Sequence, residues 1–238
     1  GDYVNLKDNV THRLNTKMNL KEFMALSGHK DYTTTHIDEL SEDDRTLSQE
    51  FNSLFKENRK LYLAFTKFLR PFRGKSKELP ISGAFPQKNP VIQWNKSKDE
   101  VILNSKKYSS PRAPDIILNG MWFEIITALK IKNKSNNKEI YLSTQINTRS
   151  SDSSTGKRFA KNEIDVLVNQ GDHMVLIECK TGTFGVDVIN KMRTSKNLYG
   201  GTTAKSVLVS IYRPQLSAKF EEQCREFNIT TYYLFEQN

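Results

Sequence analysis

The alternation of apolar and polar positions is most informative between residues 162 and 182. Two short apolar runs, 164–168 and 174–179, flank the turn-forming residues 169–172. Both runs are rich in Val, Ile and Leu and are shorter than an ordinary helix, so they predict a β-hairpin. Three charged residues lie in these strands or at their ends: Asp165, Glu178 and Lys180. Charged side chains in such apolar strands need a specific reason.

The register of the hairpin indicates on which face of the sheet these charged side chains lie. If Asn169 and Asp172 face each other across the turn, Asp165 lies opposite Leu176. Because side chains alternate between the two faces of a strand, Glu178 then shares the face of Asp165. The Cβ atoms of the two carboxylates would be about 7–8 Å apart, which one divalent cation can bridge. The opposite face would be a core layer of Ile164, Val166, Val175, Ile177 and Cys179.

This arrangement predicts a particular chemistry. Carboxylate oxygens suit Mg²⁺ or Mn²⁺, so Asp165 and Glu178 are the predicted metal ligands. Lys180 lies two residues beyond Glu178 and could orient a water or stabilise negative charge on a phosphate. The pattern therefore predicts metal-dependent hydrolysis of a phosphodiester. The alternative is a solvated strand face, where an acidic and a basic residue separated by one position are common.

Helical periodicity dominates the first third of the chain. Residues 20–26 predict a short amphipathic helix, and residues 32–37 suit a short strand or a loop. Ser41 can cap a longer helix that begins with three acidic residues and continues to about residue 69. Its Phe-rich stripe indicates a core face or a dimer seam.

A second hairpin is predicted by the apolar runs 91–94 and 100–103. A helix followed by a hairpin with basic flanks resembles a winged-helix-like unit, which would bind DNA or only mediate packing. We therefore expect a mostly helical, winged-helix-like region over residues 1–110. A second domain is expected over residues 111–238.

The first half of that second domain offers further candidate residues. Residues 120–129 predict an apolar helix with one carboxylate, Glu124, which either joins the hairpin site as a ligand or faces outward at an edge. Residues 140–147 alternate as a strand does. The polar segment 148–158 leads into the Asp165 strand. Three of its residues could reach a phosphate backbone, or could belong to a solvated loop: Arg149, Lys157 and Arg158.

The last part of the chain alternates between helix and strand. Residues 186–199 predict a basic helix, on which Lys191 and Arg193 are candidates for contacting nucleic acid. A buried strand over 206–212, a helix over 217–227 and a final strand over 230–235 follow. A hairpin joined to helices and strands in this order predicts an α/β fold with a mixed sheet and crossover helices.

Charge and composition narrow the range of partners. The 238 residues carry a formal net charge of +9 with a pI near 9.4, which favours a nucleic-acid partner. The two cysteines, Cys179 and Cys224, form no disulfide framework and favour a cytoplasmic setting. No apolar run reaches the ~18 residues of a membrane span, so no membrane partner is expected. The chain begins with Gly1 rather than Met, which favours an excised fragment over a cloning remnant.

The second domain resembles the PD-(D/E)xK nucleases and, within them, the nuclease half of the CRISPR-ancillary, CARF-linked effectors. The resemblance is strongest between about residues 119 and 212 and weak before residue 110. It rests on four motifs, which read GMWFE at 120–124, NEIDVL at 162–167, IECKT at 177–181 and YGG at 199–201. The segment NLKEFMALSG, at 19–28, is similar to the one that follows the CARF sensor in those proteins.

The resemblance implies a restriction-endonuclease-like fold and divalent-metal cleavage of single-stranded RNA and DNA, or nicking of DNA. It implies that Asp165 and Glu178 bind Mn²⁺ or Mg²⁺, that the Cys179 carbonyl completes the shell, that Lys180 is catalytic and that Glu124 supports them. It also implies an antiviral homodimer that a cyclic tetra-adenylate switches on through a CARF sensor, for which these residues show no pattern. A restriction-type or junction-resolving endonuclease, or a vestigial nucleic-acid-binding module, remains the alternative.

Overall fold

The computed structural model describes residues 2–5, 10–13, 18–26, 28–29, 31–73, 78–134, 139–146, 162–200, 203–214 and 217–235. The chain divides into two compact units: residues 1–36 with 131–238, and residues 37–130. These limits differ from the sequence-based division near residue 110. The reason is that β3, Tyr32–His36, pairs with β8, Glu139–Ile146, although more than 100 residues separate them.

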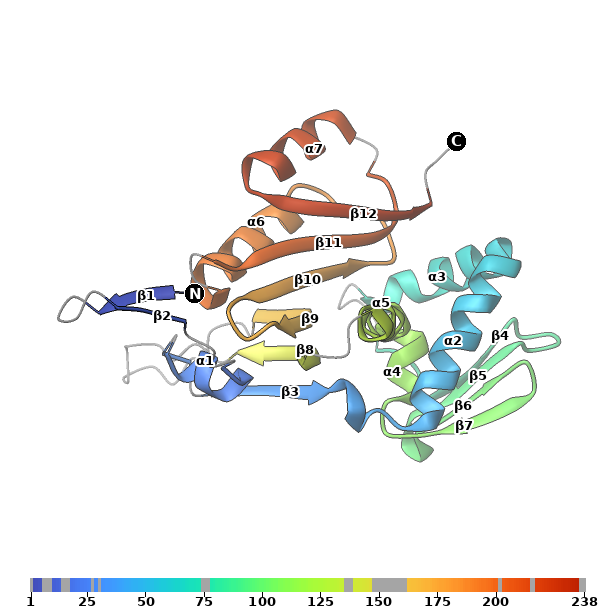
Figure 1. The fold of residues 1–238 in the computed structure, drawn as a ribbon. Coiled ribbons are helices and arrows are strands. Elements are labelled where there is room, and N and C mark those ends of the chain that lie inside the picture. The colour runs from blue at the N-terminus through green and yellow to red at the C-terminus, as the bar shows by residue number, and fades with distance from the viewer. Residues whose placement is uncertain are drawn as a thin grey trace, which may run out of the picture. The chain divides into compact units, whose positions relative to one another are not determined.

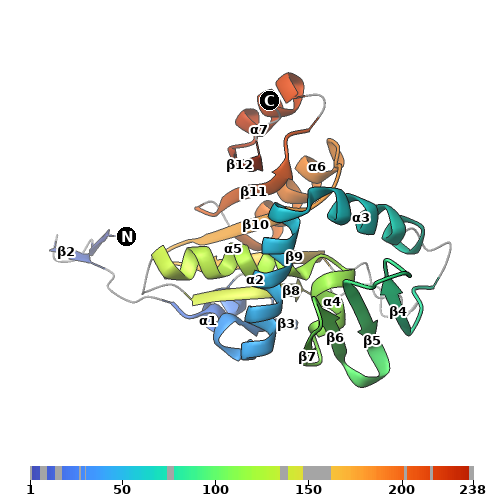
Figure 2. The same cartoon turned by 90° about the vertical axis from the view of Figure 1, so that its right-hand side faces the viewer.

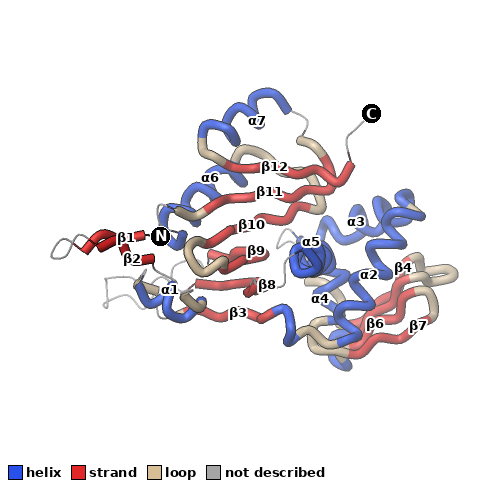
Figure 3. The backbone as a smooth tube through the Cα atoms, viewed as in Figure 1, coloured by secondary structure: helices blue, strands red, loops and turns tan. Residues whose placement is uncertain are grey.

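A six-stranded mixed sheet forms the centre of the first unit (Figure 1). Its strand order is β12-β11-β10-β9-β8-β3. Four neighbouring strands of this sheet pair antiparallel: β3, β8, β9 and β10. Of these, β9 spans Asn162–Asn169 and β10 spans Met174–Lys180. β11, Lys205–Tyr212, and β12, Ile229–Phe235, continue the sheet parallel to β10. Figure 3 shows these six strands in red.

Two helices make the crossovers that parallel strands require. These are α6, Asp187–Ser195, and α7, Ser217–Glu226. Their buried side chains form one cluster with Leu208 of β11, so both helices pack on the face of the sheet that carries Leu208. The residues of the cluster are Val188, Ile189, Met192, Leu208, Phe220, Cys224 and Ile229. A mixed sheet flanked by helices, as the sequence predicts, is confirmed.

The short helix α1, Leu20–Leu26, belongs to a second cluster in this unit. Its Phe23 and Met24 lie with Leu176 of β10 and with Tyr199, which is part of the π-helix η3, Lys196–Gly200. A Cβ atom on Gly200 would lie 2.3 Å from the Cβ of Ala204, so a side chain has no room there. The glycine in the YGG motif thus allows a close approach of two chain segments. Strands β1, Asp2–Asn5, and β2, Val10–Arg13, pair separately.

The second unit combines helices with a small antiparallel sheet, shown in Figure 2. The helices are α2, Glu42–Glu57; α3, Arg59–Arg73; α4, Ala113–Leu118; and α5, Met121–Lys134. The strands are β4, Ser82–Phe85; β5, Ile92–Asn95; β6, Glu100–Leu103; and β7, Lys106–Ser109. The predicted hairpin is thus the β5–β6 pair at the middle of a four-stranded sheet. Two 3₁₀ turns, η1 at Ile37–Glu39 and η2 at Lys96–Lys98, complete the unit.

Aromatic side chains fill the core of the second unit. The ring of Trp122 lies 5.7 Å from that of Phe51, 5.9 Å from that of Phe55 and 6.0 Å from that of Tyr62. All four side chains are nearly inaccessible to solvent. Offset and edge-on ring pairs at these distances add to the stability gained by burial. The Phe-rich stripe is therefore a core face of this unit.

The prediction of a single helix from Ser41 to about residue 69 is wrong, because the helix is interrupted at Asn58. Asn58 has φ −132° and ψ 68°, outside the helical region. Its N–H still donates to Leu54 O, while its side-chain oxygen accepts from the N–H of Leu61. One residue thus ends α2 and caps α3. The apolar spacing continues through the break, which is why periodicity alone did not reveal it.

Candidate active site

The predicted hairpin exists, but its register differs from the expected one. Asn169 faces Met174 rather than Asp172, so four residues form the loop. The Asn169 side-chain oxygen accepts from the N–H of Gly171 at 2.9 Å, and Gly171 has φ 92°, a conformation that favours glycine. The sequence-based register was wrong by two residues because the side chain of Asn169 selects a longer loop.

A shift of two residues preserves the faces of the strands. The ladder ends at the pair of Ile177 with Val166, and the next position along the two strands would bring Asp165 level with Glu178. Directly opposed Cβ atoms are about 4.5–5.5 Å apart, closer than the diagonal pair expected from sequence. The other face is buried as predicted, with Ile164, Val166, Val175, Ile177 and Cys179 each at most 9% exposed.

Asp165 is held by the backbone of the neighbouring strand. Its side chain is buried, and Oδ2 accepts a hydrogen bond from the N–H of Cys179 at 2.7 Å. Burial and then the charge of Glu178 raise the pKa of Asp165 to about 7, against the opposing effects of Lys191, the Cys179 amide and Lys180. Cys179 therefore serves this site through its N–H. Its carbonyl as a metal ligand stays a prediction.

Glu178 is only 4% exposed and is held by two lysines. Lys180 Nζ donates to Oε1 at 2.5 Å, and Lys191 Nζ lies 2.8 Å from both Oε1 and Oε2. Burial alone would lower the pKa of Lys180, but the charge of Glu178 and the hydrogen bond to it outweigh burial and raise that pKa. Lys180 is thus positively charged beside the carboxylate.

Lys191 also approaches the second carboxylate, with Nζ 4.0 Å from Asp165 Oδ1. The four side chains carry two negative and two positive charges when ionised, so their formal charges cancel. A set of opposed carboxylates with facing oxygen atoms is the donor type that Mg²⁺ and Mn²⁺ prefer. The described residues contain no group of three or more His, Cys, Asp or Glu side chains arranged to hold a metal. The pair Asp165 and Glu178 is the feature that fits such an ion.

The strand on the other side of Asp165 carries an irregularity that the sequence did not reveal. In the β8–β9 ladder, Leu142 pairs with Val166 and Thr144 with Ile164, so Ser143 comes level with Asp165. Ser143 has φ 47°, and the pairing of β8 with β3 shifts register at this level. Bulges of this kind occur preferentially beside active sites and change the direction of neighbouring side chains. A Ser-Thr sequence gives no signal for such a bulge.

The other predicted residues have different outcomes. Glu124 lies half-buried on α5, in the second unit, and its role stays a prediction. Arg193 is exposed, with its guanidinium 4.7 Å from the centroid of the Phe227 ring. Lys191, expected to contact nucleic acid, pairs with Glu178 in this structure. The remaining three candidates lie outside the described residues: Arg149, Lys157 and Arg158.

The fold and the site together define a restriction-endonuclease-like protein of the PD-(D/E)xK class. Residues 113–223 match the family model described as "Card1-like, endonuclease domain". The match shows that this segment is similar to such an endonuclease domain, and the segment contains Asp165, Glu178 and Lys180. The resemblance stated from sequence is confirmed for this domain. No sequence among the curated proteins matches the chain.

Two solved structures share the fold over nearly the whole chain. Protein VC1899 from Vibrio cholerae has a TM-score of 0.64 at 15% identity, over 96% of this chain and 60% of that one. Can2 from Sulfobacillus thermosulfidooxidans, solved with cyclic tetra-adenylate, has a TM-score of 0.59 at 18% identity, over 97% of this chain and 62% of that one. The chain thus spans about three fifths of each of these proteins. None of its described helices is long and apolar enough to span a membrane.

Proposed function

We propose that the chain is a divalent-metal-dependent endonuclease that cleaves nucleic acid as the effector part of a CRISPR defence system. The observation that carries the proposal is the pair of buried carboxylates on adjacent strands, Asp165 and Glu178, which share the neighbour Lys191, with Lys180 bonded to Glu178. Two buried carboxylates facing each other repel, and a cation between them removes that repulsion. The match of residues 113–223 to an endonuclease domain supports the same conclusion.

The residues of the site would divide the work as follows. Asp165 and Glu178, with the Cys179 carbonyl, would hold Mg²⁺ or Mn²⁺, which would polarise the phosphate and lower the pKa of a bound water. The N–H of Cys179 fixes the orientation of the Asp165 carboxylate. Lys180, kept charged beside Glu178, would donate to a phosphate oxygen as negative charge develops there. Glu124 is proposed as a supporting carboxylate from α5.

Substrate, assembly and control are also part of the proposal. Single-stranded RNA and DNA are the proposed substrates, with duplex nicking as a second possibility, and the net charge of +9 favours such polyanions. Can2 was solved with cyclic tetra-adenylate, which supports control by that signal through a sensor region. A homodimeric assembly is proposed as well. Restriction-type or junction-resolving cleavage is the alternative within the same chemistry.

The test compares cutting by the parent chain, Glu178→Gln and Lys180→Met on labelled single-stranded RNA, single-stranded DNA, plain duplex and branched duplex, each with Mg²⁺ or Mn²⁺. Lys180→Met should slow cutting by about 10²–10³-fold, and Glu178→Gln by more. Glu222→Gln, at an exposed position on α7, is the matched control and should cut normally. Undiminished cutting by both site variants would refute the assignment. Binding of nucleic acid without turnover in the parent chain would favour the vestigial module.

A further inference from the structure

Lys191 occupies the space between the two carboxylates that the proposed metal would share. Its ammonium lies 2.8 Å from both oxygens of Glu178 and 4.0 Å from Asp165 Oδ1. Among the described residues, no other cationic side chain lies within 4.0 Å of both carboxylates. Lys180, by contrast, bonds one oxygen of Glu178 only. The two lysines therefore have different positions relative to the pair.

The position of Lys191 follows from how α6 packs. Val188, Ile189 and Met192 of this helix are buried in the cluster with Leu208, which pairs with Glu178 in the sheet. Lys191 follows Val188 by three residues, so it lies on the edge of the buried stripe and its side chain can reach across to the hairpin. The rigid packing of the helix fixes the origin of the lysine, while its four-carbon stem leaves the ammonium movable.

Charge balance shows why this matters. Without metal, two carboxylates and two ammonium groups cancel, which is the arrangement that buried charges require. A divalent cation added to the same set would leave an excess of two positive charges at short range. The nearest positive side chain would then repel the metal ion. That side chain is Lys191, because it lies beside both proposed metal ligands, Asp165 and Glu178.

We infer that Lys191 is a built-in cation that stabilises the metal-free site and must leave the carboxylates when a divalent metal binds. This inference rests on the proposed function and deepens it, because it makes metal binding a competition with a side chain of the same protein. The metal-free chain would be folded but closed to weakly binding cations. A lysine that merely supported the metal ligands from outside would have the opposite effect on metal affinity.

The test measures Mn²⁺ binding by calorimetry in the absence of nucleic acid. Lys191→Met removes the competing charge and should bind Mn²⁺ about tenfold more tightly, since a unit charge at this range shifts ionisation equilibria by about 1–3 pKa units. An outer supporting role predicts instead a loss of about 10–100-fold. Lys191→Arg keeps the charge and should bind no more tightly than the parent. Lys219→Met, exposed on α7, makes the same charge change away from the site.

Thermal unfolding supplies a second readout. Without metal, Lys191→Met should melt at a lower temperature than the parent, because two buried carboxylates have lost a cation. Saturating Mn²⁺ should raise the melting temperature of Lys191→Met by more than that of the parent, since ligand stabilisation follows affinity. Equal or weaker Mn²⁺ binding by Lys191→Met would overturn the inference. If Asp165→Asn and Glu178→Gln bind Mn²⁺ as the parent does, the proposed function itself fails.

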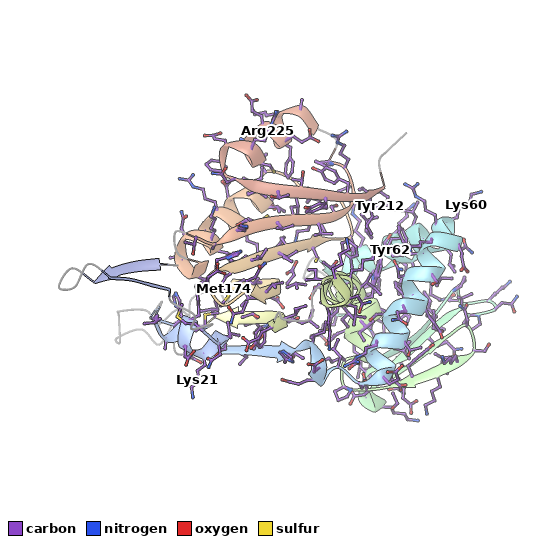
Figure 4. The ribbon with its side chains drawn as sticks, in the orientation of Figure 1. Lys21, Lys60, Tyr62, Met174, Tyr212 and Arg225 are labelled. Carbon is purple, nitrogen blue, oxygen red and sulfur yellow. The ribbon has the colours of Figure 1, made fainter. Side chains whose placement is uncertain are left out.

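A second, independent feature is the outer face of α3 in the other unit. The helix carries five Lys or Arg residues and no Asp or Glu. Lys60, Lys67 and Arg70 are exposed and lie within one sector of the helix, as spacings of seven and ten residues require. None of the three has a hydrogen bond or ion pair with another described residue. In Figure 4, Lys60 points away from the unit, whereas Tyr62 points towards its interior.

The geometry points to this basic face of α3, defined by Lys60, Lys67 and Arg70, as a contact for the phosphate backbone of nucleic acid. At about 1.5 Å per residue the three cations span about 15 Å, several phosphates long. Unpaired cations that follow one another along a rigid helix suit a linear polyanion. The endonuclease domain in the same chain makes nucleic acid the expected polyanion.

The test replaces all three by Gln and measures binding to labelled single-stranded DNA at several salt concentrations with a chelator present. Losing three phosphate contacts should lower the slope of log affinity against log salt by about 2. The matched control replaces Lys88, Lys96 and Lys98, three exposed lysines of the same unit. Equal losses from the two triple variants would refute a specific contact. The contact with nucleic acid would also be refuted if the triple Gln variant lost binding to vesicles of anionic lipid but kept its binding to nucleic acid.

Discussion

Each unit of the molecule contains buried carboxylates, and the two units differ in the groups that compensate the buried charge. In the second unit Asp44 is fully buried, accepts from the N–H of Ser41 at 3.0 Å and from the hydroxyl of Ser110, and lies 3.7 Å from Arg112. Asp44 and Ser41 form a capping box at the start of α2. In the first unit Asp165 and Glu178 face each other, and only lysine side chains neutralise Glu178.

The difference in partners distinguishes a carboxylate that stabilises the fold from the carboxylates of the proposed active site. Asp44 is a single carboxylate, and its partners within this unit are the Ser41 N–H, the Ser110 hydroxyl and the Arg112 guanidinium, so it needs no added cation. Asp165 and Glu178 are a buried pair of like charges, and burial followed by the charge of Glu178 raises the pKa of Asp165 to about 7. Burial of a carboxylate alone does not mark an active site. The proposed active site rests instead on two neighbouring buried carboxylates that lysine side chains hold.

The sharpest break between the two regions is expected in catalysis. Glu178→Gln keeps the size of the side chain but removes a ligand charge, so cutting should fall by about 10³-fold, equivalent to about 4 kcal/mol of activation free energy. Asp44→Asn should leave the rate per folded molecule nearly unchanged. Rates measured on samples of known folded fraction decide this. A comparable loss of rate in both variants would remove the distinction.

The pH dependence of stability should also separate Asp165 from ordinary carboxylates. Its pKa of about 7 in the folded chain exceeds the ordinary 3.8, so folding is favoured by protonation of Asp165. Its contribution to the free energy of unfolding is fully present below about pH 4 and is lost as the pH rises through 7, an effect of at most a few kcal/mol. The free energy of unfolding of the parent minus that of Asp165→Asn, both measured without metal, should therefore decrease as the pH is raised from 4 to 7.

The control for this measurement is Glu222→Gln, whose exposed side chain on α7 should give a difference from the parent that stays nearly constant over the same range. Urea unfolding at each pH gives the free energies. A difference between the parent and Asp165→Asn that is flat, or that rises with pH, would contradict the raised pKa.

The smallest expected effect is on the structural side. Asp44→Ala removes the Asp44 half of the capping box of α2 and leaves the Ser110 hydroxyl without its acceptor, so the free energy of unfolding should fall by about 2 kcal/mol. Asp44→Asn keeps an oxygen that can accept from Ser41 and should lose less. Urea unfolding of both variants beside Glu178→Gln gives the comparison. If Glu178→Gln is destabilised more than Asp44→Ala, the pair is a structural element rather than a metal site.

The sequence by itself determined the local features of the site. The two runs of Val, Ile and Leu predicted the hairpin, and strand alternation placed Asp165 and Glu178 on one face and Val166 and Ile177 on the other. These conclusions survive a register error of two residues because the period of a strand is two. Ser41 as the cap of α2 was equally local, since it depends on residues three positions apart.

The tertiary structure decided what depends on packing and on weak local choices. The Asn169 side chain selected the four-residue loop and thereby put Asp165 opposite Glu178, and Asn58 divided one apolar pattern into two helices. Lys191 reaches the carboxylates because α6 turns Val188, Ile189 and Met192 towards Leu208, a rotation that no spacing in the sequence encodes. The hairpin supplied the carboxylates of the site, and the packing of α6 placed beside them the ammonium of Lys191, which lies 13 residues from Glu178 in the sequence.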